Sequence, residues 1–247
     1  MRAFREDSRV TEKTPEKSLS NRIFGPALVV ILSVIWGLAF VAIRRAVLEL
    51  SPINLTLLRW LVVSGSFLLL APIIGKPKAP IRREHIPRIT LVAFASVGGY
   101  HLSLNYAETI VSSGLAGLLI SFGPIFVVLL SAIFLKEKIG IKLTTALALA
   151  TIGAIILSLN SDLSFVYITG PLAVVLAAFM YSLFAVGSKP LVANYGALPT
   201  AVWVAVLGTV FILPLLSGSF FAEVQSLSLT GGSQYCISLS LAPSWLT

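Results

Sequence analysis

The chain has 247 residues, of which 57% are hydrophobic and only 11% are charged. A water-soluble domain of this length needs more polar surface, so the composition indicates a protein of the lipid bilayer. Its 18 lysines and arginines against 10 acidic residues give a net charge of +8. The single cysteine excludes an intramolecular disulfide and any metal site built from several cysteines.

Seven long apolar stretches predict seven membrane-spanning helices. A helix needs roughly 20 apolar residues to cross a bilayer core, and most of these stretches reach that length. They lack the strict alternation of β-barrel strands, so the predicted fold class is an all-α, polytopic membrane helix bundle. In chain order the stretches are Ile23–Ile43, Ile53–Ile74, Leu91–Ala107, Thr109–Leu135, Leu143–Ser161, Leu163–Ser188 and Pro190–Ala222.

The distribution of basic residues predicts the orientation. Lysines and arginines gather in the polar segment 1–22 and in every second connection, whereas Arg44 and Arg45 fall on the opposite side. In membrane proteins, basic residues accumulate in the loops on the cytoplasmic side, so we expect a cytoplasmic N-terminus. We also expect an uncleaved first span and a plasma (inner) membrane location. The positive charge then indicates contact with membrane lipids and not with nucleic acid. His85, in the basic second connection, is expected to be solvated.

An internal repeat indicates how the helices are organised. Similar hexapeptides begin at Gly25 and Gly170 and open two of the predicted spans. The likeness continues, with Trp36 aligned to Tyr181, Arg44 to Lys189 and Ser51-Pro52 to Leu198-Pro199. Five predicted spans precede the second copy, and an odd number reverses its orientation in the membrane. Inverted repeats of this kind are a transporter architecture.

The repeat predicts four segments along the chain. They are a cytoplasmic tail (1–22), a first five-helix repeat (23–161), a partial second repeat of two helices (162–222) and an atypical polar tail (223–247) that is rich in Ser, Gly and Gln. The predicted bundle therefore has inverted five-helix repeats of which the second is incomplete.

Short motifs over about residues 23–222 have the order and spacing of a known family. The motif residues are Ser33-Val-Ile-Trp36-Gly37-Leu-Ala-Phe40, Pro52 with Arg59-Trp60, Asn105-Tyr106-Ala107, Ser113-Gly114, Gly117, Pro124, Glu137, Gly140 and Gly153. In these motifs the chain resembles the EamA-type permeases of the drug/metabolite transporter (DMT) superfamily. The stretch from the third to the fifth helix is the most specific part of the likeness.

This resemblance implies ten helices in two inverted repeats, both termini in the cytoplasm, and alternating-access transport of small metabolites or drugs without a bound cofactor. Such proteins often export amino-acid-like compounds. The chain departs from the pattern after residue 222, where no eighth to tenth helix follows. We expect a truncated or frameshifted copy; a genuine seven-helix protein, or one completed by homodimerisation, is the alternative. A copy that lacks those helices and a partner would be transport-inactive.

Arg59 is the clearest charged residue inside a predicted span. A charge in the bilayer interior costs about 2.5 kcal/mol or more, so such residues usually have a function. The planar guanidinium suits an anionic group of a substrate, such as a carboxylate. The alternative is a structural arginine that snorkels to the external end of its helix or bonds with Glu49 or Glu108.

The third predicted helix carries a polar and aromatic patch formed by Tyr100, His101, Asn105 and Tyr106. His101 and Asn105 share one face because they are four residues apart. His101 titrates near neutral pH and is a candidate for proton coupling, with an interhelical hydrogen bond as the alternative.

Trp36 lies well inside the first predicted helix, away from the interfacial aromatic belt, and its repeat-mate is Tyr181. Either a cavity-lining or a core-packing role fits these two residues. The predicted substrate-binding residues are Trp36, Arg59, His101, Asn105 and Tyr181.

Two single residues, Pro124 and Glu137, give further predictions, and common enzyme motifs are absent from the sequence. Pro124 predicts a kink in the fourth helix, and Glu137, at a cytoplasmic helix end, predicts a structural or gate-closing salt bridge. The two histidines are far apart in sequence, and no Walker A or Rossmann glycine pattern occurs, so we expect no catalytic residue, no metal site and no enzyme.

Overall fold

The computed structural model describes residues 19–74, 80–137, 140–141, 144–149, 152–153 and 168–226. All regular secondary structure within these residues is helical, which confirms the predicted fold class. Most of the tail 1–22, most of the predicted fifth span Leu143–Ser161 and the tail beyond Ser226 lie outside the described residues.

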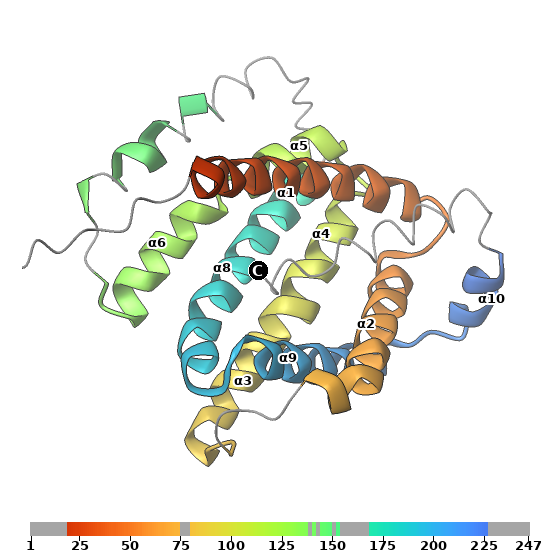
Figure 1. Ribbon diagram of the computed structural model, residues 1–247. Coiled ribbons are helices and arrows are strands. Elements are labelled where there is room, and N and C mark those ends of the chain that lie inside the picture. Colours follow the sequence, from red (N-terminus) through yellow and green to blue (C-terminus); the bar gives the residue numbers. More distant parts are fainter. Residues whose placement is uncertain are drawn as a thin grey trace, which may run out of the picture. The chain divides into compact units, whose positions relative to one another are not determined.

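The helices follow one another in the order shown in Figure 1. They are α1 (Leu19–Ala46), α2 (Pro52–Ile74), η1 (Arg83–His85), α3 (Ile86–Ala93), η2 (Phe94–His101), α4 (Leu102–Ala107), α5 (Ser113–Ile120), α6 (Gly123–Phe134), α8 (Thr169–Tyr195), α9 (Ala197–Ile212), η4 (Leu213–Leu215) and α10 (Phe220–Gln225). Within the described part, four stretches are long and apolar enough to cross a membrane: Pro52–Leu70, Ser113–Phe134, Thr169–Tyr195 and Ala197–Leu215.

The chain divides into two units, Met1–Ile35 and Trp36–Thr247. All packing described below lies inside the second unit. There α8 packs against α4 and α6, and α2 packs against α9 (Figure 1). These contacts bury small and branched side chains such as Leu57, Val97, Ala177 and Val204, as expected for closely packed membrane helices.

The third predicted helix is continuous from Ile86 to Ala107, but its middle segment, η2, is a π-helix. A π-segment adds a residue to a turn and so changes the direction of the side chains that follow it; such segments often occur at functional sites. η2 ends with Tyr100 and His101, two residues of the polar patch.

The predicted kink at Pro124 is confirmed. α5 ends at Ile120 and α6 begins at Gly123, with Pro124 in its first turn. The Ser182 hydroxyl of α8 lies 3.0 Å from the Gly123 carbonyl oxygen at this break and 2.7 Å from the Ala178 carbonyl oxygen of its own helix. A polar side chain of a neighbouring helix thus lies against the break.

The predicted boundary between the sixth and seventh spans is wrong. α8 continues through Lys189 and Pro190 to Tyr195, and the chain turns at Gly196, whose φ of 96° suits glycine. A proline removes one helical hydrogen bond, but the helix after it is retained because Leu191 and Tyr195 are buried. The seventh helix therefore starts at Ala197 and ends at Ile212, so the predicted span Pro190–Ala222 is wrong at both ends.

The prediction of a solvated His85 is also wrong. Its Nδ1 lies 2.8 Å from the hydroxyl of Tyr195, and the same hydroxyl accepts a hydrogen bond from the Arg82 amide at 3.0 Å. The connection before α3 is thus tied to the end of α8. No local pattern indicates this contact, because the two partners are 110 residues apart in the chain.

Glu137 forms a salt bridge, as predicted. The Nζ of Lys189 on α8 donates to both carboxylate oxygens of Glu137 at 3.0 Å. It also donates to the Ser131 hydroxyl at 3.3 Å. The bridge links the chain after α6 to α8.

We expect only a small loss of stability when this bridge is removed. About half of each side chain is exposed, and exposed ion pairs contribute about 0–1 kcal/mol. Lys189→Gln should therefore lower the unfolding temperature of the purified protein by a few degrees at most, and less still in high salt. A loss of folded protein on this substitution would show that the bridge is essential to the fold.

Candidate functional site

Arg59 lies in the first half of α2 and is buried, with 5% of its surface exposed. Its charge acts on the hydroxyl of Tyr100 and on the ring of His101, both on η2. The guanidinium therefore lies inside the protein, within electrostatic range of the polar patch of the third helix. Trp60, the next residue, is buried as well.

An aromatic cluster, defined here as the rings of Trp36, Trp60, Tyr100, His101 and Tyr181, lies near Arg59 and also contacts the ring of Phe184. The His101 ring lies 5.0 Å from the ring of Trp60 and 4.6 Å from that of Tyr100. Tyr100 lies 5.4 Å from Tyr181 of α8, and Tyr181 lies 6.4 Å from Trp36 of α1 in an edge-to-face arrangement. Tilted and edge-to-face contacts at such distances are the favoured geometry of aromatic pairs.

The aromatic cluster is exposed at one end. Trp36 has 44% of its surface exposed, whereas His101 and Trp60 are buried. The Nδ1 of His101 has no hydrogen-bond partner among the described residues, so the structure provides no interhelical hydrogen bond through this atom.

Asn105 lies one turn beyond His101 and is fully buried. Its Nδ2 donates to the Thr56 hydroxyl of α2 at 2.8 Å, while its Oδ1 has no partner among the described residues. Asn105 therefore joins α4 to α2 and retains one free acceptor. Tyr106, the last residue of the predicted patch, is largely exposed and lies outside the cluster.

The five predicted site residues thus come together in part. Trp36, His101 and Tyr181 belong to one chain of ring contacts, Arg59 lies within electrostatic range of it, and Asn105 is next to it along α4. Two members of the cluster were not among the predicted site residues. These are Trp60, for which its position next to Arg59 was the available signal, and Tyr100, which lies beside His101.

This arrangement is suited to a small organic anion. A buried guanidinium binds a carboxylate through two parallel hydrogen bonds, and aromatic faces accommodate an apolar body or a cation. Among the described residues, no group of three His, Cys, Asp or Glu side chains has a geometry that suits a metal ion.

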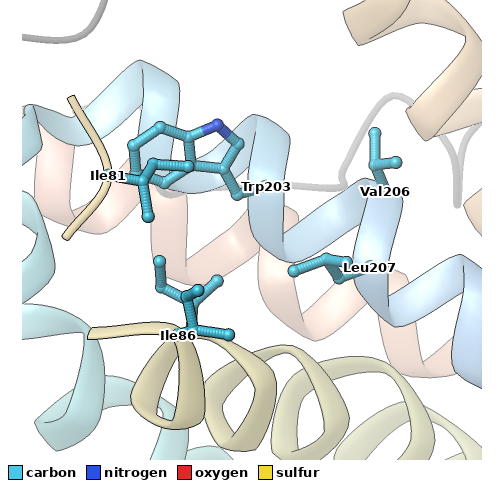
Figure 2. A pocket seen from close by; sticks show the side chains of 6 residues that line it. Ile81, Ile86, Trp203, Val206 and Leu207 are labelled. Atoms are coloured by element: carbon cyan, nitrogen blue, oxygen red, sulfur yellow. The ribbon is translucent and has the colours of Figure 1, made fainter. Parts of the chain in front are cut away.

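A separate groove of about 450 Å³ lies between the start of α3 and α9. Its lining is apolar, and Figure 2 shows Ile81 beside the indole of Trp203, with Ile86 and Leu207 nearby. No charged side chain lines the groove, and the indole N–H of Trp203 is the one side-chain hydrogen-bond donor among its lining residues, which is too little to orient a polar solute. It is therefore not the candidate site for one.

Comparison with known proteins identifies the family. The model of the EamA-like transporter family matches residues 23–159. The chain belongs to the EamA-like transporter family. It is an EamA-type permease of the DMT superfamily and a multi-pass membrane protein, and its family indicates a transporter rather than an enzyme.

Several curated members of this family are similar to the chain. It is 33% identical over 196 residues to an "uncharacterized transporter" of Archaeoglobus fulgidus, which covers 79% of this chain and 68% of that protein. It is also 33% identical over 187 residues to a "probable terminal-alkyne amino-acid exporter" of Streptantibioticus cattleyicolor, covering 76% and 62% of the two chains. A "probable amino-acid metabolite efflux pump" of Escherichia coli is 24% identical over 208 residues, with 81% and 67% covered.

The matched regions are thus about 60% to 68% of the length of the first relatives. The EamA family model and the identity to named transporters establish the family of this chain. The compounds that those relatives transport are given in their own names, and they are properties of those proteins.

Proposed function

We propose that this EamA-family permease exports small amino-acid-like metabolites across the plasma (inner) membrane by alternating access, with its N-terminus in the cytoplasm. The names of two relatives, an amino-acid exporter and an amino-acid metabolite efflux pump, support this substrate class. The concentration of basic residues on one side supports the orientation.

The observation that carries the proposal is the buried guanidinium of Arg59 beside the aromatic cluster. Its planar guanidinium offers parallel N–H donors that match the two oxygens of a substrate carboxylate. In the proposed complex Arg59 binds the carboxylate, and the free Oδ1 of Asn105 accepts a hydrogen bond from the ammonium group. Trp36, His101 and Tyr181 line the space for the side chain.

Alternating access in this proposal uses two inverted repeats, residues 23–161 and 162–222. The helix bounds support the alignment of the two copies. In the first copy a break separates α1 from α2, and in the second copy a break separates α8 from α9. Trp36 and Tyr181 hold equivalent positions in the two copies, and their rings are in contact. Substrate would bind near this pair.

An export assay tests the proposal. Cells that express the chain, and matched cells with the empty vector, are preloaded with a panel of labelled amino acids and with the carboxamides of the same compounds. We expect faster efflux of at least one amino acid from the expressing cells and no acceleration for its carboxamide, because only the acid carries the group that Arg59 binds.

The opposite result would support the alternative function, a transport-inactive membrane protein. If the chain is present in the membrane at a normal level and no compound of the panel leaves faster than from vector cells, the export proposal is wrong. Purification of the chain in its oligomeric form would then show whether transport requires a second copy or another subunit.

A further inference from the structure

A buried acidic side chain, Glu108, lies one helical turn beyond Asn105. It is the C-cap of α4, and 0% of its surface is exposed. Its Oε1 has no hydrogen-bond partner among the described residues, and its Oε2 has only a long contact of 3.5 Å with the hydroxyl of Ser113. A buried carboxylate normally has several hydrogen-bond donors or a paired cation around it, so this environment suits a neutral carboxyl.

Arg44 of α1 is the nearby cation, but its hydrogen bond is to the main chain. Its Nη1 donates to the backbone oxygen of Glu108 and not to the carboxyl group. The guanidinium therefore holds the end of α4 in position, and its charge acts on the carboxyl from a distance.

The other elements near Glu108 contribute few ionisable groups. Tyr100 of η2 lies within electrostatic range. The helix α5 and the first half of α8 carry no acidic or basic residue. The ionisable group of α2 is Arg59, and that of α10 is Glu223, which accepts a hydrogen bond from the Ser51 amide. Arg44 is thus the cation whose charge opposes protonation of Glu108.

We propose that Glu108 is a proton-binding site of this transporter. Its carboxylate takes up a proton from the external aqueous phase. As the protein changes conformation, the carboxyl group releases the proton to that phase or to the cytoplasm. The coupling of this proton to export rests on the proposed function; the binding of the proton does not. The reaction is a proton transfer from hydronium to one carboxylate oxygen: an O–H bond of hydronium breaks, the carboxyl O–H bond forms and water is left.

The electrostatics of the site agree with the geometry. Burial raises the pKa of Glu108 to about 8, against the opposing effects of the Arg44 charge and the Ser113 hydrogen bond. The carboxyl is thus mainly protonated in the folded protein at neutral pH. It loses its proton only when the solution becomes alkaline or when a conformational change exposes it to water.

The direction of the pH dependence follows from this shift. The pKa is higher in the folded state than in the unfolded chain, so the folded protein binds more protons between the two values. The stability that Glu108 contributes is fully present below the unfolded value, near 4.5, and is lost as the pH rises through about 8. The unfolding temperature should therefore fall across this range, and less so in Glu108→Gln.

Infrared difference titration of the purified chain tests the proton site without any transport assay. We expect the carbonyl band of a protonated carboxyl to disappear with a midpoint near pH 8 and to be absent from Glu108→Gln. Glu223→Gln is the matched control, because a hydrogen bond from the Ser51 amide lowers the pKa of Glu223 and keeps it ionised. The band should be unchanged in this control.

Two results would overturn the proposal. One is a wild-type protein with no band that titrates above pH 6; the other is a band that remains in Glu108→Gln. If Glu108→Gln fails to fold, Ser113→Ala provides the second test. In this variant Glu108 loses the hydrogen bond from Ser113, so the midpoint pH of the band should be higher than in wild type. An unchanged midpoint would show that the band belongs to another group.

Coupling is measured in proteoliposomes with the solute found by the export assay. We expect an external pH lower than the internal one to stimulate solute exit several-fold in wild type and in Glu223→Gln, and this stimulation to be lost in Glu108→Gln. Exit that is independent of the pH gradient would contradict coupling. An absence of solute flux in every condition would instead count against the export function, and the infrared result would still decide the proton site.

Discussion

Replacement of Arg59 with methionine is expected to reduce export of the carboxylate-bearing substrate by about 10- to 100-fold. Hydrogen bonds to charged groups contribute about 1.5–3 kcal/mol, and each 1.4 kcal/mol corresponds to about a factor of ten in binding. Methionine is unbranched, flexible and uncharged, so it can replace the aliphatic part of the arginine side chain at this buried position. The level of folded protein in the membrane should remain normal. Efflux of the labelled amino acid from preloaded cells gives the measurement.

Two further variants separate charge from geometry. Arg59→Lys keeps the positive charge but loses the planar fork, so export should be intermediate. Arg88→Met removes an arginine that is exposed at the start of α3 and should leave export unchanged. Wild-type export by a well-expressed Arg59→Met protein would show that this arginine has a structural role only.

The largest effect on folding is expected at Gly208 of α9. A Cβ atom at this position would overlap the side chain of Val97 on η2, lying 2.7 Å from its Cβ, and would approach the Ala93 carbonyl oxygen to 3.1 Å. The Cβ of Val97 is fixed to its backbone and cannot move away, so the two helices must separate. Overpacking of this kind costs about 1–3 kcal/mol. Gly208→Ala should therefore lower the unfolding temperature clearly, and Gly208→Leu should prevent folding.

Size-exclusion chromatography of detergent-extracted protein after heating measures this loss. Gly65→Ala on α2 is the matched control, because a Cβ at that position meets no atom within 4 Å. Val97→Ala in the Gly208→Ala background should restore part of the stability by removing the two methyl groups. Equal stability of Gly208→Ala and Gly65→Ala would mean that α9 and η2 do not pack as closely as described.

The all-helical fold class was predictable from the sequence, because a long apolar run in a bilayer has few alternatives to a helix. The end of α8 was not, because the Lys189-Pro190 pair has the local features of a helix boundary. Tertiary contacts made by Leu191 and Tyr195 outweigh the proline and extend the helix to Gly196. The π-segment before His101 also had no signal, since its hydropathy is that of an ordinary helix.

The candidate site was predictable where a residue was unusual for its position. Arg59 and Asn105 are polar residues in apolar runs, and Trp36 and Tyr181 were linked by the repeat. Glu108 lies between two predicted spans, where an acidic residue is usually exposed to water, and only the structure shows that it is fully buried. Burial depends on the packing of α1 and α5 around the end of α4, which no local pattern records.

Binding of ligands to the purified chain tests the central claim most directly, that Arg59 and the aromatic cluster recognise a carboxylate. Titration calorimetry would compare an exported amino acid with its carboxamide, for wild type and for Arg59→Met. We expect wild type to bind the acid at least tenfold more tightly than the carboxamide, and Arg59→Met to show no such preference. Equal affinity of wild type for the two compounds, or the same preference in Arg59→Met, would contradict the account.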